Sequence, residues 1–347
     1  MVENMPMASS PVLKLTAALL LALLGGGPSA DAETLRGPLQ LRHVHPLLTG
    51  FHTATIAWLP GAPAGAFRFQ HGSTGANTYL YDPRLLYDTF TAIVDTASYL
   101  GSVSAAFQPV PALSGRLTVD YVALSGGIAD PLIETHHELF KLPNAGRELR
   151  PQYESRVLLA YEDQVWLDQE GPVAALSRLA VEARWRSIRR FRGNGAVAAG
   201  LQGLVSLPLS RQALPLGSGS VDTGVTGIIQ LENQPWEVYG NLGWLHYGAP
   251  RTAEGIPLRQ NALRYGLAWV WAVVPRFALQ VQILGQTSPL DFDHPRLGGH
   301  MSIAGFGLSY HPSERLSVSA AFVEEFFTYA AVDVALHLGL QIRGGGP

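Results

Sequence analysis

The feature that most constrains this chain is a strict alternation of apolar and polar residues in the stretch AVDVALHLGLQIR, residues 331–343. One face carries Val332, Val334, Leu336, Leu338, Leu340 and Ile342, and the other carries Asp333, Ala335, His337, Gly339, Gln341 and Arg343. Because successive side chains of a strand point to opposite faces, the stretch predicts a β-strand with one apolar and one polar face. The apolar face must contact either a protein core or lipid.

The same alternation recurs in five more stretches, which are SRLAVEARW, WEVYGNLGWLH, ALRYGLAWVWAV, RFALQVQILGQ and ERLSVSAAF. These stretches are about ten residues long, whereas strands of globular domains usually have about five or six. Tilted strands of about ten residues cross the hydrocarbon core of a bilayer. The pattern between Phe51 and Arg343 therefore predicts an all-β fold, a transmembrane antiparallel up-and-down β-barrel of about 12–14 strands. The alternative is a secreted β-sandwich, in which the apolar faces of two sheets meet.

The N-terminal residues have the pattern of a secretory signal peptide. Lys14 precedes the short apolar run LTAALLLALLGGG, and the small residues PSADA follow, with Ala30 and Ala32 in an Ala-x-Ala arrangement. The apolar run is too short to span a bilayer, so a membrane anchor is the weaker interpretation. We predict a signal peptide over residues 1–32, an outer-membrane β-barrel domain over residues 33–347, and export to the outer membrane of a Gram-negative cell.

One segment, GGIADPLIETHHELFKLPNAGREL at residues 126–149, departs from the strand pattern. Its apolar residues recur at helical spacing. Asp130 can cap a helix that has Pro131 in its first turn, and Pro143 follows the end of that helix. The segment predicts a short helical insertion near residues 129–142, placed between two strands of the barrel.

Charge and cysteine content exclude several functions. The formal net charge at pH 7 is -3, and so nearly balanced a charge favours no nucleic-acid partner. The chain contains no cysteine, which excludes a disulfide scaffold, a cysteine nucleophile and a thiolate metal site. We predict no cofactor.

Four blocks of the chain look familiar. They are the helical segment from Ser125 to Pro151, the run GSGSVD at 217–222, the run QTSPL at 286–290, and FVEEF followed by VDVALHLGL. On these blocks the chain resembles the family catalogued as domain of unknown function 3187 (DUF3187), over about residues 38–343. Ser210-Arg211 stands where that family typically has Thr-Gly. The resemblance implies a β-barrel envelope protein of the outer-membrane type, and it implies no activity.

The densest polar cluster lies on the predicted helix. Asp130, Glu134 and His137 are spaced four and three residues apart, so they share one helix face, and Arg147 follows them. Histidine and carboxylate side chains are plausible ligands for zinc or another divalent ion. The alternative, which we favour, is a polar helix face that pairs with Arg147 or with an arginine of the lumen. We therefore predict no metal site.

Two further sets of polar residues could line or close the barrel. Arg178, Glu182, Arg184 and Arg186 share one strand face; if that face is the lumen, they could favour anions, hold the helix in place, or form ordinary salt bridges with their neighbours. The run Gly217, Ser218, Gly219, Ser220 with Asp222 predicts a turn before a strand. It is not a phosphate loop, because no strand-then-helix context surrounds it.

Three His-x-Ser pairs raise an enzyme alternative, a barrel hydrolase that acts on lipid with a histidine base and a serine nucleophile. The pairs are His71/Ser73, His300/Ser302 and His311/Ser313. Three scattered copies argue for chance, so we predict no catalytic residue and favour a protein that is not an enzyme.

The function that the sequence favours is a channel, or a binding and passage protein for a small solute of unknown identity. The alternatives are a lipid-modifying barrel enzyme and a structural barrel with a protein partner. The expected partners are the lipid bilayer and, during assembly, the barrel-insertion machinery.

Overall fold

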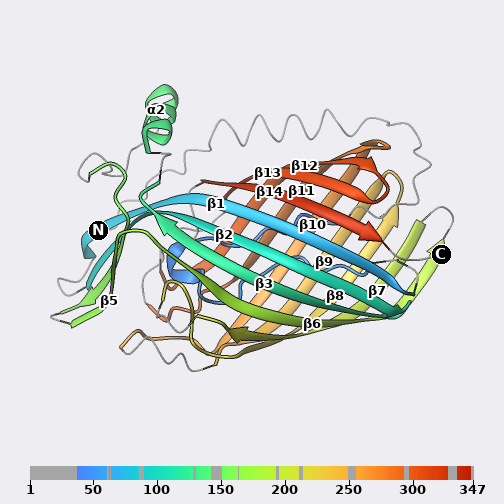
Figure 1. Ribbon diagram of the computed structural model, residues 1–347, viewed down its shortest axis with the longest axis horizontal. Coiled ribbons are helices and arrows are strands. Elements are labelled where there is room, and N and C mark those ends of the chain that lie inside the picture. The colour runs from blue at the N-terminus through green and yellow to red at the C-terminus, as the bar shows by residue number, and fades with distance from the viewer. Residues whose placement is uncertain are drawn as a thin grey trace, which may run out of the picture.

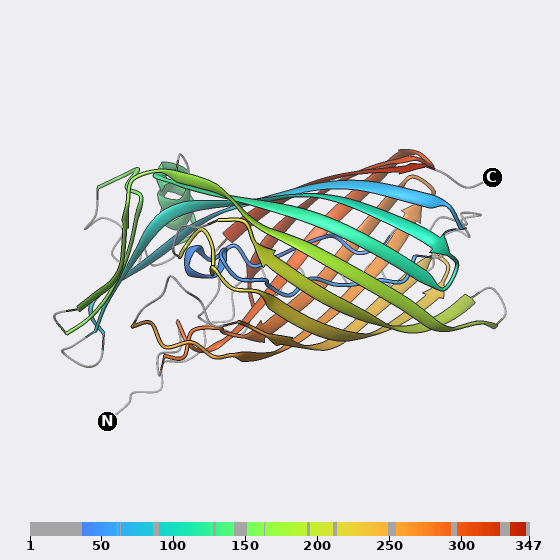
Figure 2. The same cartoon turned by 60° about the horizontal axis from the view of Figure 1, so that its bottom comes forward.

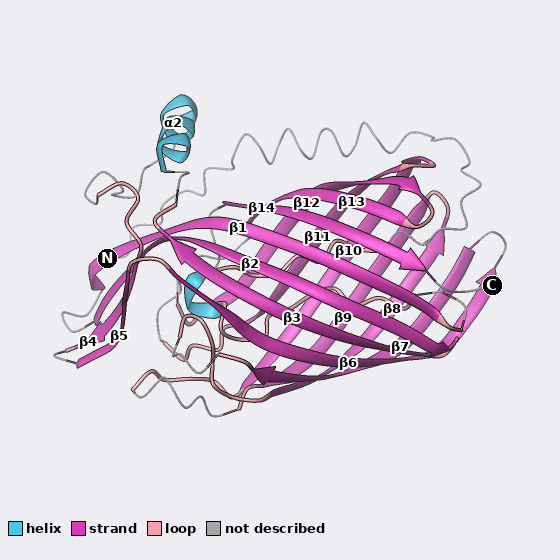
Figure 3. Cartoon of the chain, viewed as in Figure 1, coloured by secondary structure: helices cyan, strands magenta, loops and turns pink. Residues whose placement is uncertain are grey.

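The computed structural model describes residues 37–60, 62, 64–85, 90–127, 130–141, 151–162, 164–192, 195–210, 214–248, 255–292, 297–326 and 334–344. The predicted signal peptide, residues 1–32, lies outside the described residues. Most of the described chain is strand (Figure 3).

The elements follow one another in an almost uninterrupted series of strands (Figure 1). In chain order they are η1 (Pro46–Leu48), β1 (Ala66–Leu85), β2 (Phe90–Val110), β3 (Leu113–Ser125), α2 (Asp130–Phe140), β4 (Arg156–Tyr161), β5 (Gln164–Glu170), β6 (Val173–Arg192), β7 (Gly195–Pro208), β8 (Asp222–Asn233), β9 (Trp236–His246), β10 (Asn261–Val274), β11 (Phe277–Thr287), β12 (His300–Ser313), β13 (Leu316–Glu325) and β14 (Val334–Gly344).

Twelve of these strands close into an antiparallel barrel. Strands β1–β3 and β6–β14 pair in order, and β1 bonds to β2 on one side and to β14 on the other. Closure leaves no unpaired sheet edge around the ring, because every barrel strand has a neighbour on both sides. The structure therefore confirms the predicted up-and-down barrel, with a strand number at the lower end of the predicted range.

The two ends of the barrel differ. At one end, which we call the turn end, the connections β2–β3, β6–β7, β8–β9, β10–β11 and β12–β13 each contain two residues. The opposite end, which we call the loop end, carries the longer connections. Helix α2 lies outside the barrel at the loop end (Figure 1), within the range predicted for the helical insertion. No helix in the described part of the chain is long and apolar enough to span a bilayer.

Strands β4 and β5 form a hairpin that extends the sheet beyond the barrel. Strand β3 pairs with the Ala97–Val110 part of β2, and β4 pairs with the Phe90–Asp95 part. The hairpin therefore continues the barrel wall on one side of the loop end (Figure 1).

The outward face of the barrel is apolar and has no second sheet against it. On β14, Leu336, Leu338, Leu340 and Ile342 are exposed, while Ala335 and His337 on the opposite face are buried. Each barrel strand carries at least one such exposed large apolar side chain. All described strands belong to a single sheet, so the β-sandwich alternative is wrong.

Aromatic side chains gather on this outward face at the turn end. The rings of Trp236 and Trp269 stack with centroids 4.7 Å apart, and Phe277 stacks on Tyr310 at 4.6 Å. Trp236 and Phe277 are the first residues of β9 and β11, directly after two-residue turns. This position is typical of the aromatic girdles that flank the apolar band of membrane barrels.

The interior of the barrel is filled by the segment that precedes β1. Sequence reasoning placed strands from Phe51 onward, and this was wrong, because the first strand begins at Ala66. Phe51 itself is fully buried among side chains from several strands. Residues 37–60 of this segment run inside the barrel (Figure 2) and form the centre of the candidate site.

Candidate functional site

Residues 37–60, which we call the plug, enter the lumen, turn, and return. The start of the plug lies near the turn end, where the Leu39 backbone N–H donates to Gln280 Oε1 at 3.1 Å. The turn contains η1, where Leu47 and Leu48 pack among residues of the loop end. The returning arm reaches the turn end again at Pro60, whose carbonyl accepts a bond from Arg186 at 3.2 Å. The plug therefore occupies the length of the lumen as a hairpin without strands (Figures 2 and 3).

Side-chain amides of the barrel wall satisfy the backbone of the plug. Gln286 Oε1 accepts from the Ala54 N–H at 2.6 Å, and Gln230 Oε1 accepts from the Leu59 N–H at 3.0 Å. Asn241 bonds twice to one residue, because it accepts from the Ala57 N–H at 2.5 Å and donates to the Ala57 carbonyl at 3.0 Å. A buried backbone needs such partners, and an amide offers a donor and an acceptor together.

Charged groups of the wall also hold the plug. Asp120 on β3 is fully buried and bonds to Arg42 of the plug and, at 2.6 Å, to Arg178 of β6. Arg184 donates to Glu182 at 2.5 Å and to the Trp58 carbonyl of the plug at 3.2 Å.

The four predicted residues of β6 thus lie on the lumen face. Arg178, Glu182 and Arg184 are buried, and Arg186 is partly buried. They do not hold helix α2, which lies outside the barrel. They take part in a network that secures the plug, a role that sequence reasoning did not foresee.

The run of glycines and serines before β8 closes over the turn of the plug. Gly217, Ser218, Gly219 and Ser220 form a loop, and β8 begins at Asp222. The Ser218 N–H donates to the Gly50 carbonyl at 3.1 Å, and Asp222 Oδ2 accepts from the His52 N–H at 3.3 Å. A Cβ on Gly50 would lie 2.9 Å from the Gly217 carbonyl carbon, so this close approach requires glycine.

The described residues of the predicted helix cluster make separate contacts and do not form one site. Asp130 accepts from the Asn77 side chain at 2.5 Å and from the Tyr153 N–H at 2.9 Å, so it ties α2 to β1 and to the start of the hairpin segment. Glu134 accepts from Gln152 at 3.0 Å. The side chain of His137 and all of Arg147 lie outside what the structure describes. Among the described residues, no group of three or more His, Cys, Asp or Glu could hold a metal ion.

The first His-x-Ser pair on β12, His300 and Ser302, is not arranged as a base and a nucleophile. Ser302 Oγ donates to the Phe326 carbonyl at 2.6 Å. His300 Nε2 lies 2.9 Å from the Tyr265 hydroxyl instead. The two side chains therefore have separate partners.

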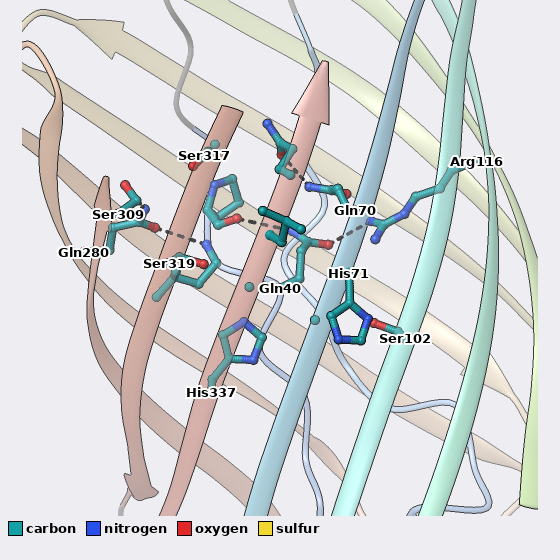
Figure 4. Close-up of a pocket in the computed structure, with 17 residues that line it drawn as sticks. Gln40, Gln70, His71, Ser102, Arg116, Gln280, Ser309, Ser317, Ser319 and His337 are labelled. Atoms are coloured by element: carbon teal, nitrogen blue, oxygen red, sulfur yellow. Dashed lines mark hydrogen bonds between the residues drawn. The ribbon is translucent and has the colours of Figure 1, made fainter. Parts of the chain in front are cut away.

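Two adjoining cavities lie between the plug and the wall near the turn end. The larger has a volume of about 370 Å³ and is bounded by Pro60, by strands β1, β2, β3, β6 and β14, and by the β12–β13 turn. The smaller, of about 40 Å³, lies beside the start of the plug. Gln70 and Arg116 line both cavities. Figure 4 shows Arg116 reaching Gln40 of the plug, at 2.8 Å, across the smaller cavity.

Comparisons with known proteins agree with the barrel. A family model described as "Protein of unknown function (DUF3187)" matches residues 17–343. The crystal structure of the COG4313 outer membrane channel from Pseudomonas putida F1 is similar with a TM-score of 0.52 and 11% identity, over 82% of this chain and 98% of that one. The NanC porin is similar with a TM-score of 0.42 and 6% identity, over 81% of this chain and 100% of that one. No curated protein matches the chain. At these identities the likeness shows the fold alone.

Proposed function

The chain belongs to the DUF3187 family, and we propose that it is an outer-membrane channel for small solutes whose lumen is closed by its own plug. Its barrel resembles that of an outer-membrane channel. The proposal rests on the kind of contacts that hold the plug in the lumen. Besides apolar packing, amides and arginines of the wall bond to the backbone of the plug, and Asp120 pairs with Arg42; water can replace such polar bonds when the plug moves.

The outward face supports a position in the outer membrane. The exposed apolar residues on every barrel strand would contact lipid, and the aromatic rings at the turn end would lie at one interface. In membrane barrels of bacteria the short turns face the periplasm. We therefore place the turn end on the periplasmic side. The predicted signal peptide and the barrel-insertion machinery would act before the barrel is assembled in the membrane.

The wall behind the plug carries polar side chains among apolar ones such as Leu284 and Ile303, and a solute channel needs such polar groups. Gln230, Asn241 and Gln286 would present their amides to solvent if the plug moved aside, and the arginines of β6 would line the opened path. A structural barrel would gain more from an apolar interior, because buried polar groups are costly unless each is paired. The amides and arginines of the wall thus support a lumen that opens.

The experiment locks the plug with an engineered disulfide, which the absence of native cysteine makes unambiguous. A Cβ on Gly266 of β10 would lie 2.8 Å from Ile56 Cγ1 of the plug, close to where a cysteine sulfur would sit. The variant Ile56→Cys with Gly266→Cys is reconstituted in planar bilayers, oxidised or reduced. We expect openings from the wild type and the reduced variant, and none from the oxidised variant.

The single variants Ile56→Cys and Gly266→Cys are the controls, because they carry the same substitutions without the crosslink. Equal conductance of the oxidised and reduced double variant would show that the plug is not the gate. Silence of the wild type with a range of small solutes would contradict the channel itself.

A further inference from the structure

The larger cavity at the turn end is lined by more positive than negative side chains. Five arginines and one glutamate face it among the described residues, namely Arg68, Arg116, Arg184, Arg315, Arg343 and Glu314. They come from β1, β3, β6, β14 and the β12–β13 turn, so the closure of the barrel brings them together. Repulsion among like charges in a partly buried space is strong, and Glu182, which pairs with Arg184, offsets only part of it.

Neutral groups hold two of these arginines in place. The guanidinium of Arg68 lies over the Trp58 ring of the plug, 4.2 Å from its centroid. Arg116 donates to Gln40 Oε1 of the plug at 2.8 Å and to Ser104 Oγ at 3.0 Å. These contacts orient the guanidinium groups without neutralising their charge.

The same two arginines carry buried donors without a partner. Arg68 Nε and Arg116 Nε are out of contact with solvent and have no hydrogen-bond acceptor among the described residues. At the rim, the Arg343 N–H donates to the Arg315 carbonyl at 2.8 Å, which places these two arginines side by side at the mouth of the cavity. The positive side chains thus surround one space of ligand size, while the two unpartnered Nε–H groups lie behind the surface of the cavity.

We propose that this cavity binds a small oxyanion, a carboxylate or a phosphate group. The planar fork of guanidinium donors matches the paired oxygens of both groups. The proposal deepens the proposed function, on which it rests, because it names small anionic solutes as the class that the channel binds at its turn end. Trp58 and Gln40 belong to the plug, so the site is complete when the plug is seated.

The test measures binding rather than conductance. The full chain is purified in an uncharged detergent and phosphate-free buffer, and inorganic phosphate, succinate, choline and glucose are titrated in a calorimeter. We expect heat of saturable binding with phosphate, succinate or both, and none with choline or glucose. The comparison of phosphate with succinate identifies which oxyanion fits.

Variants assign the binding to the cavity. We expect Arg68→Gln to weaken binding at least tenfold, and Arg315→Gln, at the exposed rim, to weaken it about threefold. The matched control is Arg156→Gln, an arginine on the β4–β5 hairpin outside the barrel. Heat-dependent gel mobility shows whether each variant still forms the barrel; if Arg68→Gln does not, Arg315→Gln alone decides.

The outcomes separate this proposal from the proposed channel. The oxidised Ile56→Cys and Gly266→Cys variant keeps the plug seated, so we expect it to bind the anion as the wild type does. Binding by a barrel that never conducts would support the site and contradict the channel. Absence of anion binding by the wild type, or equal loss in Arg315→Gln and Arg156→Gln, would overturn the site and leave the channel standing.

Discussion

Arg42 of the plug forms an ion pair with Asp120 of the barrel wall in the interior of the lumen. Asp120 is fully buried and also accepts a bond from Arg178 at 2.6 Å, so one carboxylate faces two guanidinium groups. Desolvation opposes the burial of each charge, and the carboxylate is what makes the two arginines tolerable there.

Replacement of Asp120 by asparagine should therefore unseat the plug. The change keeps the size of the side chain but removes the carboxylate to which both Arg42 and Arg178 bond, and loss of one partner costs about 3–5 kcal/mol in buried pairs. We expect a higher open probability in planar bilayers and a lower temperature for the heat-dependent gel shift. Asp168→Asn is the control, because it removes a partly exposed pair with Arg156, worth about 0–1 kcal/mol. Equal effects of the two substitutions would contradict this role of Asp120.

The histidines of the plug predict a dependence on pH. Burial, assisted by the nearby charges of His45 and His300, lowers the pKa of His43 to about 3, and burial lowers the pKa of His45 to about 4. A released plug would bind protons near the ordinary pKa of 6.5, whereas the seated plug would not. The seated state is therefore fully favoured above pH 6.5 and loses stability as the pH falls from 6.5 toward 4.

We accordingly expect channel openings to become more frequent in acid, by up to about tenfold per pH unit for each histidine. The double substitution His43→Leu with His45→Leu should make this profile shallower, since it removes two of the three buried histidines of the plug and leaves His52, whose pKa burial also lowers. His246→Leu, outside the plug, is the matched control and should keep the acid response. An unchanged profile in the plug variant would assign the response to other groups.

The double bond between Asn241 and Ala57 predicts a local loosening of the plug. Asn241→Leu preserves the approximate volume but leaves the N–H and the carbonyl of Ala57 without partners, at about 1–3 kcal/mol for each buried group. We expect faster amide hydrogen exchange in the returning arm of the plug. Asn261→Leu, at an exposed amide on the neighbouring strand β10, should leave that exchange unchanged. Protection of the Ala57 amide in both variants would show that the wall amides are dispensable.

The barrel was predictable because its signal is local, whereas the plug was not. Alternation in a stretch such as RFALQVQILGQ shows which residues face the lumen, and Gln280 does lie there. Its partner, the Leu39 N–H, is 241 residues away in sequence, and no local pattern connects the two. Likewise the spacing of Arg178 and Arg184 predicts that they share a strand face, but it does not predict that they help to hold the plug. The glutamine and asparagine side chains on the lumen faces of several strands are the signal that could have suggested a backbone segment inside the barrel.

The outward face provides the last prediction, which tests the contact with lipid. Leu338 lies in the middle of β14 and is 64% exposed, and Val165 on the protruding β5 is 62% exposed. The two positions are thus equal in accessibility and differ in whether the bilayer would surround them. Arginine at the centre of a lipid-facing strand costs about 2–4 kcal/mol, and in water it costs little. Leu338→Arg should therefore reduce the amount of assembled barrel in the outer-membrane fraction, while Val165→Arg should not. Since both substitutions add the same charge, an equal yield of heat-modifiable barrel from the two variants would mean that lipid does not cover β14.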